Sequence, residues 1–182
     1  MIASLAAHWA EIAVALVCVG VCAVAGGLST EIGPWYRSLR FPRLKPPDWA
    51  FGPGWTTIFL FIAASGVVGW NAADPQGRTL MIWLFAINFI LNLLWSPLFF
   101  KLHRPDWALV EWVFFWLSIV ALVVAMFSIS TLAGWLMTPY LAWVTYAGWL
   151  NWRVVVLNRP FGALAPGAAG TSRRPSSDGR RS

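Results

Sequence analysis

The residues best placed for chemistry are amides and aromatic rings that recur at helical spacing inside long apolar segments. They fall on three stripes, namely Trp55, Phe59 and Ile62; Asn88, Asn92 and Trp95; and Tyr140, Trp143, Ala147 and Asn151. If the stripes face one another, they enclose aromatic walls with a few hydrogen-bonding groups, as in most small-molecule sites. Spacing alone leaves simple packing equally open, because Trp and Asn also cross-link helices in bundles.

The composition identifies the class of protein that carries these stripes. The chain has 182 residues, of which 59% are hydrophobic and 11% charged, with 14 tryptophans and a mean hydropathy of +0.65. Soluble domains carry about a quarter charged residues, so a water-soluble globule is excluded, and the long apolar blocks exclude a disordered chain. The composition predicts a membrane protein.

Five segments are long and apolar enough to be membrane helices, which need about 20 residues. They are residues 12–28, 50–70, 79–100, 107–128 and 134–157. The fold expected is an all-α integral membrane protein, a five-transmembrane-helix bundle formed by residues 1–158. The first segment is expected to stay uncleaved, because residues 1–10 lack the Lys or Arg of a signal peptide. The tail, residues 159–182, is basic and is expected to be disordered.

The basic residues predict an orientation. Of the 13 Lys and Arg residues, all except Arg78 lie in the first loop, the third loop or the C-terminal part of the chain, which five crossings place on one side. The positive-inside rule then places the N-terminus outside and the C-terminus in the cytoplasm if the protein is in a bacterial inner membrane; an outer membrane stays open. No nucleic-acid partner is expected, because the cations form no groove of their own.

Other chemistry finds little support. Cys18, Cys22 and Gly26 form a ridge of small residues, which suits close helix packing better than a disulfide or a metal site. The chain has no glycine-rich phosphate loop, paired intramembrane carboxylates or HExxH motif, so no classical catalytic residues and no metal ligands are predicted. Pro97 is expected to interrupt the third helix.

Three sequence blocks resemble a known family. They are WYRSLRFPRLKPPDWAFGPGW (35–55), NFILNLLWSPLFF (88–100) and PYLAWVTYAGWLNW (139–152). Together they are similar to the TspO/MBR family, the tryptophan-rich sensory proteins and translocator proteins, also called peripheral-type benzodiazepine receptors. The resemblance runs in order from about residue 31 to residue 158, across all five predicted helices.

The resemblance implies a five-helix bundle, usually a homodimer, with a ligand cavity roofed by the loop 29–49. Family members bind porphyrins and haem, and eukaryotic members also bind cholesterol and benzodiazepine-type drugs. Some bacterial members promote light-dependent porphyrin breakdown, and others act in tetrapyrrole or stress responses. Porphyrin or haem is therefore expected as a ligand rather than an obligatory cofactor, with membrane lipid as the surroundings.

The family's pocket positions match eight residues of this chain: Trp35, Trp49, Trp55, Phe59, Asn88, Asn92, Trp143 and Asn151. Two of them depart from the family pattern, because Phe59 stands where many members have Tyr and Asn88 where others have Gln. The sequence around Trp152 lacks the Tyr of the cholesterol-recognition pattern, which makes sterol recognition doubtful.

The leading hypothesis is a membrane receptor or sensor for a porphyrin-type tetrapyrrole. The macrocycle is expected to stack on Trp55 or Trp143, with its propionates reaching cations of the roof loop, for which the candidates are Arg40, Arg43 and Lys45. Catalysis, in this hypothesis, is photochemical and involves Trp55 or Trp143. The alternatives are a carrier that moves tetrapyrroles or sterol-like lipids across the membrane, and a regulatory partner that docks through residues 160–182.

Overall fold

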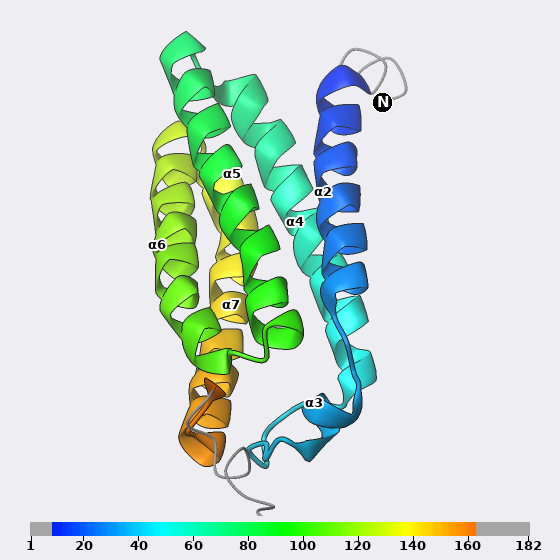
Figure 1. Cartoon of the computed structure of the whole chain (residues 1–182). Helices are drawn as coiled ribbons and strands as arrows, with labels where there is room; N and C mark the ends of the chain where they lie inside the picture. Colours follow the sequence, from blue (N-terminus) through cyan, green and yellow to red (C-terminus); the bar gives the residue numbers. More distant parts are fainter. Residues whose placement is uncertain (1–8, 163–182) are drawn as a thin grey trace, which may run out of the picture.

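The computed structural model describes residues 9–162, which form a bundle of long α-helices (Figure 1). These are α2 (Trp9–Ser29), α4 (Phe51–Ala72), α5 (Pro75–Ser96), α6 (Pro105–Ile129) and α7 (Thr131–Asn158). The predicted all-α bundle is confirmed, and no strand occurs within residues 9–162. The tail predicted to be disordered lies, from residue 163 onward, outside the described residues.

The helices have the length and composition of a membrane protein. Three segments, Asp48–Ala72, Pro75–Lys101 and Pro105–Ile129, are long and apolar enough to cross a bilayer, and Leu16–Ser29 is a shorter apolar helix. With 28 residues, α7 exceeds the roughly 20 needed, but it carries more polar residues than the other four long helices. Two of these, Tyr140 and Asn151, are buried inside the bundle rather than exposed to lipid.

The helix ends differ from the predicted ends where local capping begins a helix early. The connection predicted at residues 71–78 is only two residues long, because Pro75 occupies the first turn of α5 and Asp74 caps it by accepting from the Gly77 amide (2.7 Å). Ser130 caps α7 in the same way, so this helix begins at Thr131. At Pro97 the α-helix gives way to a π-helical turn, η2 (Pro97–Lys101), as the expected interruption.

The helices do not contribute equally to the core. α7 packs against both α6 and α4, and the main core cluster includes Ile119, Met126, Met137 and Val144. α2 packs mainly on α4 and stands at the margin of the bundle (Figure 1). Between α6 and α7 the contact is close enough that a Cβ at Gly148 would overlap the indole of Trp112.

Two connections between helices and the end of α7 meet at one end of the bundle. The loop between α2 and α4 contains α3 (Pro34–Ser38) and a 3-10 turn, η1 (Asp48–Ala50). Asn158 at the end of α7 accepts from the amide of Arg40 (2.8 Å) and donates to its carbonyl (2.9 Å). Trp35 stacks on His103, which follows η2, at 4.2 Å between ring centroids. The loop 29–49, the α5–α6 connection and the end of α7 therefore lie together.

Candidate functional site

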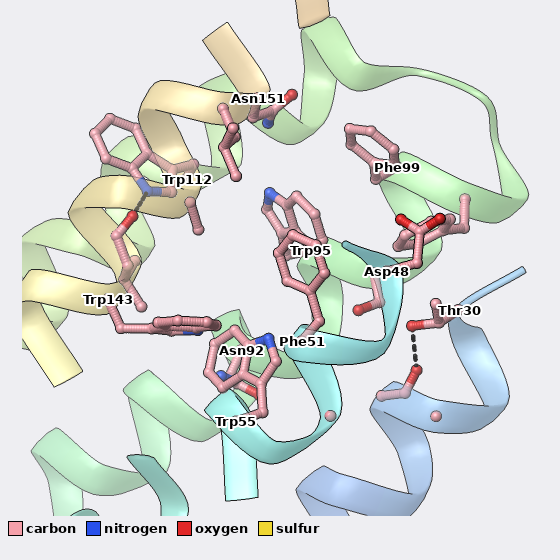
Figure 2. Close-up of a pocket in the computed structure, with 18 of the residues that line it drawn as sticks. Thr30, Asp48, Phe51, Trp55, Asn92, Trp95, Phe99, Trp112, Trp143 and Asn151 are labelled. Atoms are coloured by element: carbon pink, nitrogen blue, oxygen red, sulfur yellow. Dashed lines mark hydrogen bonds between the residues drawn. The ribbon is translucent and has the colours of Figure 1, made fainter. Parts of the chain in front are cut away.

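A cavity of about 490 Å³ lies inside the bundle at the end that the loop 29–49 covers (Figure 2). All five long helices contribute to its lining, together with residues of the loop. Eleven of the lining residues are aromatic: Tyr36, Phe41, Phe51, Trp55, Phe59, Trp95, Phe99, Phe100, Trp112, Phe115 and Trp143. Its volume falls within the roughly 300–1,000 Å³ of small-molecule sites.

Two indoles form one corner of the cavity. The rings of Trp55 on α4 and Trp143 on α7 meet edge to face, with centroids 6.2 Å apart and planes at 81°. Phe59 packs on Trp55 at 5.4 Å and Phe51 on Trp143 at 6.3 Å between ring centroids, so each indole is held by a second aromatic ring. Because the two planes are nearly perpendicular, a flat ligand can stack on one indole while it meets the edge of the other.

The loop supplies a polar cluster at the cavity. The Tyr36 hydroxyl donates to Asp48 Oδ1 (3.0 Å), and the ammonium group of Lys45 pairs with the same oxygen. Lys45 Nζ also lies 4.6 Å from the centre of the Phe41 ring. Burial and the hydrogen bond to Asp48 raise the pKa of Tyr36, so this phenol stays protonated and remains a donor. Lys45 is the cation that the loop brings to the cavity lining.

A chain of hydrogen bonds runs from the cavity into the core. Asn92 Nδ2 donates to the Tyr140 hydroxyl (3.4 Å), which donates to Asn88 Oδ1 (3.0 Å). Asn88 Nδ2 donates to Ser118 Oγ (2.9 Å), which donates to the carbonyl of Phe115 (2.7 Å). Through these bonds α5, α6 and α7 are joined by side chains at the depth of the cavity.

The structure brings most of the predicted site residues together. Lys45, Trp55, Phe59, Asn92, Trp95, Trp143, Ala147 and Asn151 all line the cavity. Asn88 and Tyr140 are buried behind it, 5% and 1% exposed, and reach it only through Asn92. Asn151 also faces the start of α6. With its amide turned so that the nitrogen donates to the Pro105 carbonyl (3.1 Å), its oxygen accepts from the Leu109 amide (3.2 Å).

Four predicted residues lie elsewhere. Trp49 is 75% exposed, in the short turn before α4, so it suits the membrane interface rather than the cavity. Trp35 is drawn away by its stacking on His103 and lines a separate groove with Asn158 and Phe161. Arg40 and Arg43 are exposed residues of the loop and are not among the lining residues.

Sequence reasoning missed the contributions of α2 and α6. Trp112 and Phe115 line the cavity from α6. The signal that could have found Phe115 is the pair Glu111 and Ser118, which share a face of this helix with it. On α2, Cys22 and Gly26 line it too, although the small residues there predicted close helix packing. Within the chain itself no helix packs closely at Gly26, because a Cβ there would have nothing within 4 Å; close contact in a dimer stays a prediction. The small residues instead leave room in the cavity.

The fold and the cavity define a class of protein: an integral membrane helix bundle with an aromatic cavity between its helices. The TspO/MBR family model matches residues 13–157 of the chain. The chain therefore belongs to the TspO/MBR family, as the three sequence blocks predicted.

Individual relatives come from bacteria and animals. Protein CrtK of Rhodobacter capsulatus is 37% identical over 138 residues, which cover 75% of this chain and 86% of the relative. Tryptophan-rich protein TspO of Chlorobaculum tepidum is 35% identical over 148 residues, 78% and 93% of the two chains. Translocator protein of Homo sapiens is 31% identical over 122 residues, 66% and 72%.

Proposed function

We propose that this protein is a membrane receptor that binds a porphyrin-type tetrapyrrole in the cavity. The observation that carries the proposal is the 490 Å³ space walled by indoles from separate helices. A porphyrin is large, flat and apolar, so it gains most from burial against aromatic rings. Stacking on either Trp55 or Trp143 places its edge against the other ring, which matches their 81° angle.

The carboxylates of such a ligand have one cation on the lining to approach. Lys45 is already paired with Asp48, so a propionate that binds it either shares or replaces that partner. A charge-assisted hydrogen bond of this kind orients the macrocycle with its acidic edge toward the loop. Arg40 and Arg43, exposed on the loop, are not needed for this contact.

Removing the two indoles is expected to weaken porphyrin binding at least tenfold. In the double variant Trp55→Ala plus Trp143→Ala the ligand loses both aromatic walls, each such contact contributing about 1 kcal/mol beyond area burial. Protoporphyrin IX is titrated against the protein in lipid nanodiscs, and binding is followed by quenching of tryptophan fluorescence.

The matched control is Trp9→Ala plus Trp83→Ala, because these two indoles are 70% and 65% exposed and lie outside the cavity. The control is expected to keep the wild-type dissociation constant. Absence of saturable quenching in the wild type, or equal affinity in all three proteins, would contradict the proposed function.

The proposal extends to photochemistry at the same two indoles. An illuminated porphyrin beside Trp55 or Trp143 can lose an electron to dissolved O₂, with the adjacent indole as relay. The porphyrin cation radical then combines with the superoxide that has formed, which gives an oxygenated macrocycle. We expect the absorbance of bound protoporphyrin to fall faster under light in the wild type than in Trp55→Phe plus Trp143→Phe. The same rate in both proteins and in empty nanodiscs would exclude a role for the protein.

A homodimer and a regulatory role in tetrapyrrole or stress responses stay predictions.

We propose that the end carrying the loop 29–49 faces the cytoplasm in a bacterial inner membrane. The support is that the loop 29–49, the α5–α6 connection and the end of α7, which carry basic residues, meet at this end. Arg78 lies near the opposite ends of α4 and α5, where its Nε donates to the Trp70 carbonyl (3.1 Å). Green fluorescent protein fused after residue 182 is expected to fluoresce, since it folds in the cytoplasm. A dark fusion with an active periplasmic reporter at the same position would reverse the orientation.

A further inference from the structure

The hydrogen-bond chain behind the cavity has a direction that is fixed at its inner end. The Phe115 carbonyl has no hydrogen to give, so Ser118 must donate its only hydroxyl proton there. Ser118 Oγ can then only accept from Asn88, which must therefore turn its NH₂ group toward the serine. As a result the carbonyl oxygen of Asn88 faces Tyr140.

The same reasoning continues to the cavity. Facing the Asn88 carbonyl oxygen, Tyr140 must donate its single proton to it, at 3.0 Å. The Tyr140 oxygen is then an acceptor for Asn92, which turns its NH₂ group inward, at 3.4 Å. Each reversed arrangement would set two acceptors or two donors against each other in a water-poor interior, at a cost that buried groups rarely bear.

This direction decides what Asn92 presents to the cavity. With its NH₂ group held by Tyr140, the opposite branch of the amide is the carbonyl oxygen. Asn92 lines the cavity (Figure 2). Within residues 9–162 its Oδ1 has no hydrogen-bond partner, and this oxygen is not completely enclosed by other protein atoms. An acceptor is therefore fixed in a predominantly apolar wall.

We propose that Tyr140 is a positioning residue that fixes Asn92 Oδ1 as an acceptor, so that between two planar ligands of equal shape the cavity binds the one with an N–H donor at its edge more tightly. The inference rests on the proposed function, because it assigns a specificity to the same cavity. A lactam or another cyclic amide has this chemistry. A ligand of the same shape whose nitrogen is methylated leaves the oxygen of Asn92 unpaired and desolvated.

The experiment compares two planar fluorescent probes, acridone and 10-methylacridone, which differ in the N–H group. Their dissociation constants are measured by equilibrium dialysis against the full-length protein in phosphatidylcholine nanodiscs, with empty nanodiscs subtracted. In the wild type we expect acridone to bind about tenfold more tightly, the change expected for one hydrogen bond. In Asn92→Leu, which keeps the approximate size but removes the acceptor, the ratio is expected to fall to about one.

Two further variants test the positioning role. Tyr140→Phe keeps the ring but frees the Asn92 amide to rotate, so the ratio is expected to fall although 10-methylacridone binds as before. Ser118→Ala removes the anchor of the chain without touching the lining, and it too is expected to lower the ratio, which a merely structural role would not change.

Three results would overturn the inference: equal affinity of both probes for the wild type, the wild-type ratio in Asn92→Leu, or no binding of acridone at all. If protoporphyrin still binds in those cases, the proposed function stands and only the specificity is wrong. If protoporphyrin does not bind either, the proposed function fails as well. If Tyr140→Phe does not fold, Ser118→Ala and Asn92→Leu still decide the matter, and a wild-type ratio in either of them rejects the inference.

Discussion

The Gly26→Phe substitution is expected to lower the affinity for protoporphyrin at least tenfold while the protein stays folded. Gly26 lines the cavity from α2, and a Cβ placed there meets no atom within 4 Å. A phenylalanine side chain therefore extends into free space rather than into a neighbouring helix, and it takes up volume that a macrocycle needs. Binding is measured by the same fluorescence titration in nanodiscs.

The control for this substitution lies six residues earlier on the same helix. Gly20 also has no atom within 4 Å of a built Cβ, but it does not line the cavity. Gly20→Phe thus adds the same side chain to α2. It is expected to leave porphyrin affinity within about twofold of the wild type, whereas Gly26→Phe is expected to lower it at least tenfold. If Gly26→Phe binds as tightly as Gly20→Phe, the cavity is not the binding site.

The second large effect is on stability, at the contact between α6 and α7. Gly148→Ala is expected to destabilise the protein by about 2 kcal/mol, because the added methyl group would overlap the Trp112 indole. Trp112 is also held by its Nε1–H, which donates to the Val144 carbonyl (2.9 Å), so the ring cannot shift without losing this bond (Figure 2). The measurement is thermal unfolding in detergent, where the midpoint is expected to fall.

A glycine of α4 gives the opposite expectation for the same change. At Gly66 a Cβ would meet Phe85 at 3.8 Å, an ordinary contact, and alanine is the better helix former by roughly 1 kcal/mol. Gly66→Ala is therefore expected to raise the unfolding midpoint slightly. A midpoint that falls equally in both variants would show that helix contact at Gly148 is not the cause.

The sequence determined the fold class through the length of its apolar segments. Each of the five segments had to form a helix because a bilayer cannot satisfy an open backbone, and each predicted segment falls within or largely overlaps a long helix of the structure. The ends were less predictable from hydropathy, since capping by Asp74 and Ser130 begins α5 and α7 within the segments assigned to connections.

The sequence also determined which faces of α4, α5 and α7 turn inward, because residues at i, i+4 and i+7 share a side of any helix. That is why Trp55, Asn92 and Trp143 line one cavity. Spacing carries no information on depth, however. Asn88 lies on the same face as Asn92 but one turn deeper in the core, where it bonds to Ser118 rather than reaching the lining.

Only the tertiary structure decided the roof and the remaining walls. The loop 29–49 has no regular periodicity from which the direction of its side chains could be predicted. Only the path of its backbone in the fold brings Lys45 to the lining and leaves Trp49 exposed. α6 is apolar over most of its surface, and its few polar residues, among them Glu111 and Ser118, do not show that Trp112 and Phe115 reach the cavity. The direction of the Asn92 amide likewise arises from three hydrogen bonds between helices. A fourth bond, within α6 at the Phe115 carbonyl, fixes that direction.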